Sequence, residues 1–137
     1  MAQAQIIEGV IQPYAWGGKE YLANLLSAEN PGNQPMAELW LGAHPKGPAK
    51  LSLEGLTLDE WIARQPSEEL GKAVAERFND RLPFLLKILD VKDMLSIQVH
   101  PNKAAAEIGF AREEANGPER TAPNRNYRDD NHKPELG

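Results

Sequence analysis

The chain has 137 residues with 20 acidic and 15 basic side chains, so its formal net charge is −5. That length suits one domain, and the acidic balance argues against nonspecific nucleic-acid binding, which requires an excess of cationic side chains. No stretch approaches the roughly 18 apolar residues of a membrane span, no signal peptide is recognisable, and the absence of Cys excludes disulfides and thiolate metal sites. These features predict a cytoplasmic protein with neither a nucleic-acid nor a membrane partner.

Apolar residues are distributed unevenly. The apolar residues of the last quarter, 111–137, are Ala111, Ala115, Ala122, Tyr127 and Leu136. Such a segment cannot form a core of its own, so it is expected to be disordered or to lie as a long loop on another part of the protein. The chain stops at what resembles the start of a further apolar element.

The first predicted elements are a strand and a short helix. Residues 6–12 are rich in β-branched side chains and are followed by Pro13 and a pair of glycines, which is typical of a strand. Apolar residues then recur at helical spacing over 19–27, which predicts a short helix.

Residues 37–44 alternate between two sets of side chains, which predicts a strand with one face in the core and one in water. Leu39 and Leu41 form the buried set. The set expected to face solvent comprises Glu38, Trp40, Gly42 and His44.

Two helices are predicted next. Thr57 and Glu60 have the spacing of a capping box at the start of the first helix. The second is expected over 68–78, where apolar residues recur every four positions.

Residues 82–89 are almost continuously apolar and predict a further strand, which carries Lys87. A lysine on an apolar strand needs a partner, an anion or a path to solvent. A functional and a structural role for Lys87 are equally open from this pattern.

The strongest local signal is the polar face of a strand predicted over 94–100. Its apolar members, expected in the core, are Leu95, Ile97 and Val99. Ser96, Gln98 and His100 share the opposite face, where side chains two residues apart can converge on one ligand. Imidazole with an amide oxygen suits a divalent ion such as zinc, although local evidence alone favours an ordinary solvated face.

A helix is predicted over 103–115, because Asn102 can cap its start and Gly117 and Pro118 follow its end. Beyond it, residues 127–135 contain a histidine, a lysine and three carboxylates, a run that is typical of a solvated loop.

A purely local interpretation of that run would pair His132 with Glu135 as metal ligands, three residues apart on one helix. Pro134 argues against such a helix, because it disfavours α geometry at Lys133.

Five blocks, spread from residue 14 to residue 135, occur together in one known family. They are Y-A-W-G at 14–17, M-A-E-L-W with G-A-H-P-K at 36–46, L-P-F-L-L-K at 82–87, L-S-I-Q-V-H-P-N-K at 95–103, and 127–135, which fits Y-x-D-x-N-H-K-P-E at every fixed position. The chain therefore resembles type I mannose-6-phosphate isomerases (phosphomannose isomerases), and in particular their N-terminal part.

The resemblance implies a fold class and a reaction. The fold would be α+β and β-rich, with a cupin-like (jelly-roll) sheet and several short helices, incomplete in this chain. Residues 1–137 would be the N-terminal portion of the catalytic cupin-type domain, and 111–137 a polar loop that delivers site residues. The reaction would be the zinc-dependent interconversion of mannose 6-phosphate and fructose 6-phosphate through a cis-enediol.

By the same resemblance, one zinc ion per chain is held by Gln98, His100 and Glu135. A fourth ligand, a histidine, has no counterpart in this sequence. The resemblance disfavours His132, which matches no ligand position of the family.

Lys133 is implied as the catalytic proton-transfer group. To act as a base at neutral pH, its pKa would have to be lowered by burial or by nearby positive charge such as zinc. The implied substrate-binding residues are Trp16, Glu38, Lys87 and Ser96. Of these, Lys87 and Ser96 suit a phosphate, because an ammonium and a hydroxyl both donate to a dianion.

A competing hypothesis is a non-enzymatic, cupin-related module that binds a sugar phosphate or a partner, one candidate partner being the protein's own C-terminal part. Because the fourth ligand and a catalytic arginine of the family have no counterpart here, the isolated chain is expected to bind metal weakly and to show little or no isomerase activity.

Overall fold

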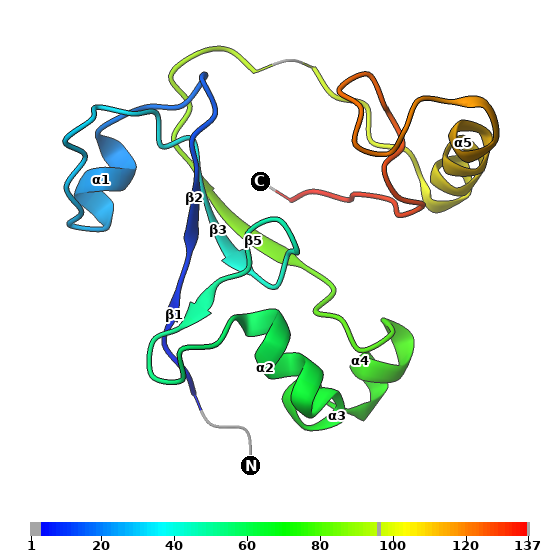
Figure 1. The fold of residues 1–137 in the computed structure, drawn as a ribbon, viewed down its shortest axis with the longest axis horizontal. Helices are drawn as coiled ribbons and strands as arrows, with labels where there is room; N and C mark the ends of the chain where they lie inside the picture. Colours follow the sequence, from blue (N-terminus) through cyan, green and yellow to red (C-terminus); the bar gives the residue numbers. More distant parts are fainter. Residues whose placement is uncertain (1–3, 96, 137) are drawn as a thin grey trace. The chain divides into compact units, whose positions relative to one another are not determined.

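A computed structural model describes residues 4–95 and 97–136 of the chain. Two compact units are present, residues 1–95 and residues 96–137 (Figure 1). The first contains all the strands of the described part together with four short helices, and the second contains one longer helix.

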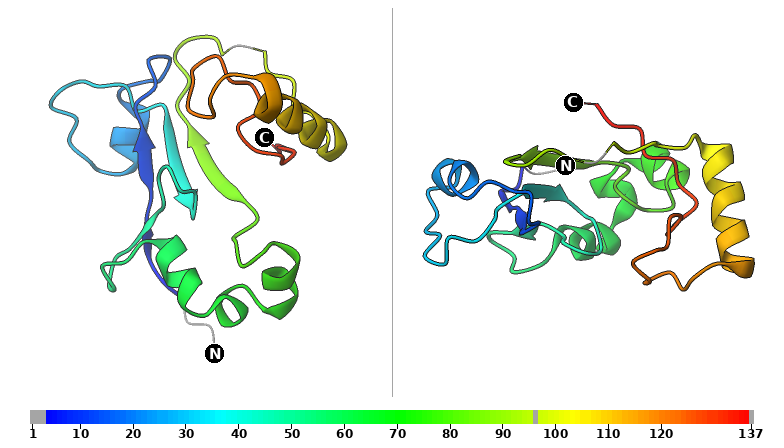
Figure 2. Two further views of the ribbon diagram at one scale, coloured as in Figure 1. Left: turned by 45° about the vertical axis from the view of Figure 1, so that its right-hand side comes forward. Right: turned by 90° about the horizontal axis from the view of Figure 1, so that it is seen from above.

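Two small antiparallel sheets form the framework of the first unit. One pairs β1 (Ile7–Glu8) with β4 (Lys50–Leu51). The other has the strand order β2-β3-β5 and consists of β2 (Val10–Gln12), β3 (Glu38–Gly42) and β5 (Leu85–Leu89), which lie side by side in Figure 2. The strands predicted over 6–12, 37–44 and 82–89 are therefore confirmed.

The strand predicted over 6–12 is divided between the two sheets at Gly9. A Cβ atom at this position would lie 2.6 Å from Leu39 Cδ1 and 2.8 Å from the Trp40 carbonyl oxygen. Glycine is therefore required here because the chain passes directly against the central strand.

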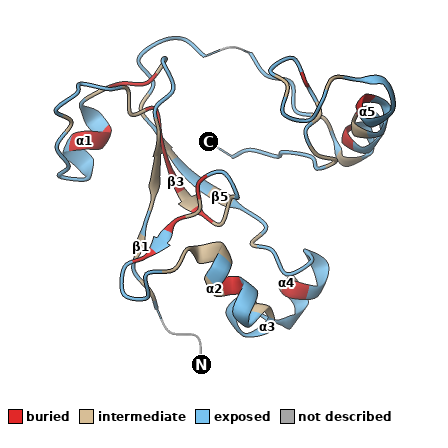
Figure 3. Ribbon diagram, viewed as in Figure 1, coloured by how far each residue is buried: buried red, intermediate tan, exposed pale blue. Residues whose placement is uncertain are grey.

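The central strand β3 is buried on both of its faces (Figure 3). Leu39 is buried as predicted, but Glu38 and Trp40 are only 8% and 7% exposed, so the prediction that they face solvent was wrong. The alternation pattern failed because the polar side chains of this strand bond to one another and to the neighbouring strand, so they are buried with partners. His44, from the same set, is partly exposed.

Four short helices complete the first unit: α1 (Tyr21–Leu25), α2 (Leu58–Arg64), α3 (Pro66–Glu69) and α4 (Lys72–Arg77). The capping box of α2 is confirmed, since the backbone N–H of Thr57 donates to the Glu60 carboxylate at 3.0 Å. This hydrogen bond lowers the pKa of Glu60, because it favours the charged form.

The single helix predicted over 68–78 was wrong, because the segment forms two helices, α3 and α4. Gly71 lies between them with φ 79° and ψ 144°. Only glycine adopts this region readily, so the helix ends there although apolar residues continue at helical spacing.

The strand predicted over 94–100 was also wrong, since the described residues of this segment form neither strand nor helix. The side chains of Ile97 and Val99, expected in the core, are 98% and 90% exposed. A strand requires a neighbour to satisfy its backbone, and no described strand pairs with this segment. Ser96 lies outside the described residues.

The second unit is organised by α5 (Lys103–Asn116). Its predicted start is confirmed, because the Asn102 side chain accepts a hydrogen bond from the Ala105 backbone N–H at 2.9 Å. Residues 111–116 of the apolar-poor quarter belong to this helix, and the described residues 117–136 form neither helix nor strand. None of the helices in the described ranges is long and apolar enough to cross a bilayer.

Candidate functional site

His100 and Glu135 lie next to each other in the second unit. His100 Nε2 is 3.7 Å from Glu135 Oε1, and the two side chains are 28% and 68% exposed. Two ligand atoms of a tetrahedral zinc site, each about 2.0–2.2 Å from the ion, lie about 3.4 Å apart. The structure thus brings two of the three predicted metal ligands close to the separation that a shared zinc ion requires.

The donor types at this pair also fit zinc, which accepts imidazole nitrogen and carboxylate oxygen. Within residues 4–95 and 97–136, no group of three or more His, Cys, Asp and Glu side chains could hold a metal. A third protein ligand from this part of the chain would therefore be of another type, such as the amide oxygen of Gln98. Gln98 is exposed and makes no hydrogen bond to the described residues.

Lys133, the predicted proton-transfer group, lies in the same segment as Glu135. Its ammonium is 3.6 Å from Asp129 Oδ2, and its side chain is 58% exposed. Burial, one of the two conditions expected of a catalytic base at this position, is therefore not met in the structure. His132, the alternative ligand from the local pattern, is exposed.

A second lysine binds this loop more extensively. Lys103, the first residue of α5, donates to the Asp130 carbonyl oxygen at 3.0 Å and to its carboxylate at 3.1 Å. The hydrogen bond from Lys103 lowers the pKa of Asp130, and the same bond raises the pKa of Lys103. The sequence signal was weak, because the two residues lie far apart along the chain and each is common on surfaces.

Two of the predicted substrate-binding residues, Glu38 and Lys87, are joined in the first unit. β3 and β5 pair Trp40 with Lys87 across the sheet. The Lys87 ammonium lies 3.4 Å from Glu38 Oε2 and 5.2 Å from the centre of the Trp40 ring. The Trp40 indole N–H also donates to Glu38. Glu38 is therefore the partner that an apolar strand lysine requires, while 34% of the Lys87 side chain remains exposed.

Trp16 is connected to this cluster through Tyr14. The two rings stack with their centres 5.7 Å apart. Partial burial raises the pKa of Tyr14, and the negative charge of Glu38 raises it further.

Tyr14 was missed by the sequence reasoning as a site residue, and the Trp40–Glu38 hydrogen bond was not anticipated. The only available signal was their position inside the Y-A-W-G and M-A-E-L-W blocks. An aromatic side chain on a strand is more often a packing residue, and here Trp40 serves in packing and in hydrogen bonding at once.

Comparison with known proteins identifies a family model and curated relatives that match this chain. A family model described as phosphomannose isomerase type I, catalytic domain, matches residues 5–137. Among curated proteins, mannose-6-phosphate isomerase of Escherichia coli K12 is 52% identical over 129 residues, which cover 92% of this chain and 33% of that protein. The rat protein of the same name is 44% identical, with 93% and 30% covered.

Solved structures agree with the sequence comparisons. A mannose 6-phosphate isomerase bound with zinc and yttrium is 49% identical and superposes with a TM-score of 0.85, covering 93% of this chain and 33% of that chain. The apo form from Salmonella typhimurium is also 49% identical, with a TM-score of 0.86 and 97% and 33% covered.

The chain thus spans about a third of the length of the curated relatives that it matches. The α+β class predicted from the sequence, with antiparallel sheets and short helices, is confirmed. Because the family model covers residues 5–137 and relatives agree at 44–52% identity, the chain belongs to the phosphomannose isomerase type I family.

Proposed function

We propose that this chain is the N-terminal portion of the catalytic, cupin-type domain of a zinc-dependent isomerase that interconverts mannose 6-phosphate and fructose 6-phosphate. The observation that carries the proposal is the 3.7 Å approach of His100 and Glu135, in a chain that matches the family from residue 5 to residue 137. The names of the relatives supply the substrate, and one solved relative is bound with zinc.

In this proposal one zinc ion is held by His100, Glu135 and Gln98, and the remaining coordination position is taken by water, substrate or a further protein group. When bound, zinc would polarise or orient the oxygens of the sugar. The exposure of the two side chains supports a metal site that substrate can reach, because the His100 side chain is partly buried while that of Glu135 is exposed to solvent.

The reaction moves a proton between C1 and C2 of the sugar through a cis-enediol, so a group of the chain must accept a proton from carbon and return it. We assign this transfer to Lys133. Its ammonium lies beside Asp129 in the structure. Lys133 would therefore have to leave Asp129 to act on substrate, and the residues 129–135 would have to rearrange locally.

Lys87 and Ser96 are proposed to bind the phosphate group, with Trp16 and Glu38 beside the sugar. The Lys87 ammonium has three N–H donors, its Glu38 contact is at 3.4 Å, and a third of its side chain is exposed. Donors on Lys87 therefore remain available for a dianion without breaking the pair with Glu38.

The proposal is tested by a chimera in which this chain replaces the matching third of the Escherichia coli relative. We expect zinc-dependent formation of fructose 6-phosphate from mannose 6-phosphate. A His100→Ala chimera should lose both the activity and the bound zinc, whereas His132→Ala, the matched control, should keep both. The isolated 137-residue chain should show little or no turnover.

A folded chimera that binds mannose 6-phosphate but is inactive with saturating zinc would contradict the proposal. If, in addition, its sugar-phosphate binding were independent of zinc and of His100, a non-enzymatic binding module would be the better description.

A further inference from the structure

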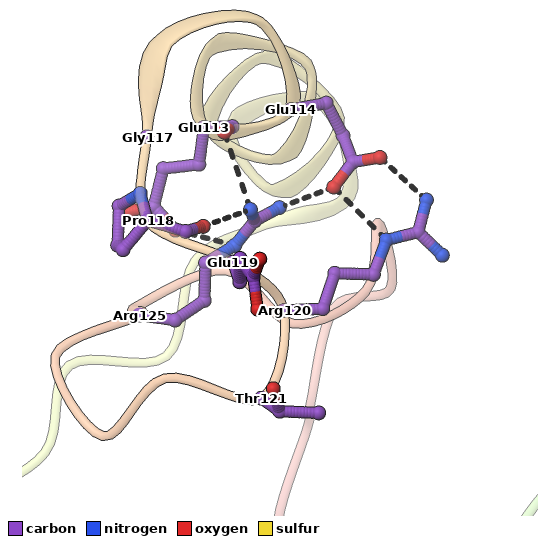
Figure 4. A pocket seen from close by; sticks show the side chains of 8 residues that line it. All are labelled: Glu113, Glu114, Gly117, Pro118, Glu119, Arg120, Thr121 and Arg125. Atoms are coloured by element: carbon purple, nitrogen blue, oxygen red, sulfur yellow. Dashed lines mark hydrogen bonds and ion pairs between the residues drawn. The ribbon is translucent and has the colours of Figure 1, made fainter.

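Arg125 is a buried cation on the segment that follows α5 (Figure 4). Only 2% of its side chain is exposed. Its guanidinium lies 3.0 Å from the Glu113 carboxylate and donates to the Glu114 carboxylate at 2.7 Å. It also donates to three backbone carbonyls, those of Glu113, Pro118 and Tyr127, at 3.2, 2.7 and 2.7 Å.

Glu113, on the last turn of α5, also binds the segment that carries Arg125. Its carboxylate accepts hydrogen bonds from the backbone N–H groups of Tyr127 at 2.8 Å and Asn126 at 3.2 Å. The Asn126 side chain donates a third, at 3.1 Å. These bonds, that of the Tyr127 N–H foremost, lower the pKa of Glu113, so the carboxylate is held in its charged form.

Arg125 and Glu113 therefore both bind the backbone of Tyr127, Arg125 through its carbonyl and Glu113 through its amide. Arg125 also ties this segment to the end of α5 through the carbonyls of Glu113 and Pro118. We call this arrangement the 113/125 clamp. A buried ion pair of this kind contributes little net stability compared with apolar packing. The Arg125 guanidinium is planar and makes several hydrogen bonds of fixed direction, so it favours one backbone conformation of this segment over others.

The segment leaving the clamp is tied to α5 a second time before it reaches Glu135. Lys103, at the opposite end of the helix, holds Asp130 by its carbonyl and its carboxylate. Four residues separate Asp130 from Glu135, so the two can lie at most about 18 Å apart when the chain is fully extended. His100 lies two residues before Asn102, the cap of the same helix. The helix that follows His100 thus also guides the return of Glu135 towards it.

We propose that Glu113 and Arg125 are positioning residues for the metal-binding pair, and that the 113/125 clamp keeps the return segment ordered so that Glu135 stays beside His100. The inference rests on the proposed function only where it concerns the binding of zinc by His100 and Glu135. The order of the segment is a property of the chain itself and is measurable without metal.

The test compares three variants of the 137-residue chain with the parent. Glu113→Gln keeps the shape of the side chain and removes its charge, and Arg125→Lys keeps the charge and removes the planar donor set. Arg120→Ala is the matched control, because Arg120 binds Glu114 in the same cluster but is 61% exposed. It is not one of the groups that hold the backbone of Asn126 and Tyr127.

Two quantities are measured for each protein. The first is the order of residues 126–135 without metal, from amide exchange and 15N relaxation. The second is the Zn²⁺ dissociation constant, from competition with a chromophoric chelator. We expect Glu113→Gln and Arg125→Lys to lose protection over 126–135 and to bind Zn²⁺ about 10–100-fold more weakly, the usual effect of removing a group that orients a ligand. Arg120→Ala should match the parent in both.

Parent-like order and parent-like Zn²⁺ affinity in both clamp variants would overturn the inference. Unfolding of α5 in both would overturn it as well, because the clamp would then serve folding rather than positioning. If the parent binds no Zn²⁺, or His100→Ala binds it equally well, the proposed metal site fails. The metal-free measurement then decides the positioning role alone: loss of order at 131–135 supports it, and unchanged order refutes it.

Discussion

At the scale of single residues, the candidate site is a set of charged groups whose partners are specific. Glu38 is almost buried and is bound by Lys87 and by the Trp40 N–H. Glu114 is bound by two arginines, Arg120 and Arg125. In each case a carboxylate is matched by two donors, and removing a donor should have a measurable cost.

Lys87→Met is expected to destabilise the first unit, because Glu38 would keep its buried position and lose its cation. Lys87 is a third exposed, so we expect about 1–2 kcal/mol, between the values for exposed and fully buried pairs. The free energy of unfolding in urea measures this loss. Adding Glu38→Gln to Lys87→Met should recover part of the lost stability. If Lys87→Met lowered the free energy of unfolding equally with Glu38 and with Gln at position 38, the two residues would not be coupled.

Glu114 should titrate far below an ordinary glutamate. Hydrogen bonds from Arg120 and then Arg125 lower the pKa of its carboxyl to about 2. Because the folded pKa is lower than the unfolded one, the associated stability is present above the ordinary glutamate pKa and is lost as the pH falls from about 4.5 towards 2.

A carboxyl 13C titration by NMR measures the Glu114 pKa directly. We expect Arg120→Ala to raise it, because that change removes the largest cause of its lowering. A midpoint near the ordinary glutamate value in the unmodified chain would show that these ion pairs do not form in solution.

At the scale of elements, the predicted helix caps were correct, whereas a predicted strand and a predicted continuous helix were wrong. The capping box at Thr57 and the Asn102 cap depend on residues three apart, and both are present. The strand predicted over 94–100 depended on a pairing partner that no pattern in the segment itself can supply, and the described segment is unpaired. The break at Gly71 was missed because apolar spacing continues across it while the backbone does not.

Gly109, in the middle of α5, has a role that helix propensity alone would misjudge. An added Cβ atom would lie 2.5 Å from Cε1 and 2.6 Å from Cε2 of the Tyr127 ring, far inside van der Waals contact. Gly109→Ala should therefore destabilise the second unit by about 1–3 kcal/mol through overpacking, although alanine normally stabilises a helix interior.

The control for this prediction is the same change in a Tyr127→Ala background, where the ring is absent. There, Gly109→Ala should become stabilising by up to about 1 kcal/mol, as helix propensity predicts. Thermal unfolding followed by circular dichroism reports both values. Stabilisation by Gly109→Ala in the unmodified chain would contradict the close packing of Tyr127 on α5.

At the scale of the whole molecule, the two sets of predicted site residues belong to different compact units. Trp16, Glu38 and Lys87 lie in the first, and His100 and Glu135 lie in the second. The family and the α+β class followed from the sequence blocks, because these blocks are specific in combination. The Tyr14–Trp16 stack and the 113/125 clamp did not, because each depends on side-chain contacts that no pattern along the chain encodes.

The most direct test of the account is a Zn²⁺ titration of the 137-residue chain by competition with a chromophoric chelator. The account predicts that one Zn²⁺ binds weakly to each chain. His100→Ala and Glu135→Ala should each weaken binding by more than about a hundredfold, beyond what loss of an outer partner costs, while His132→Ala should leave it unchanged. Absence of binding, or equal binding after His100→Ala and Glu135→Ala, would contradict the assignment of this pair as the metal site.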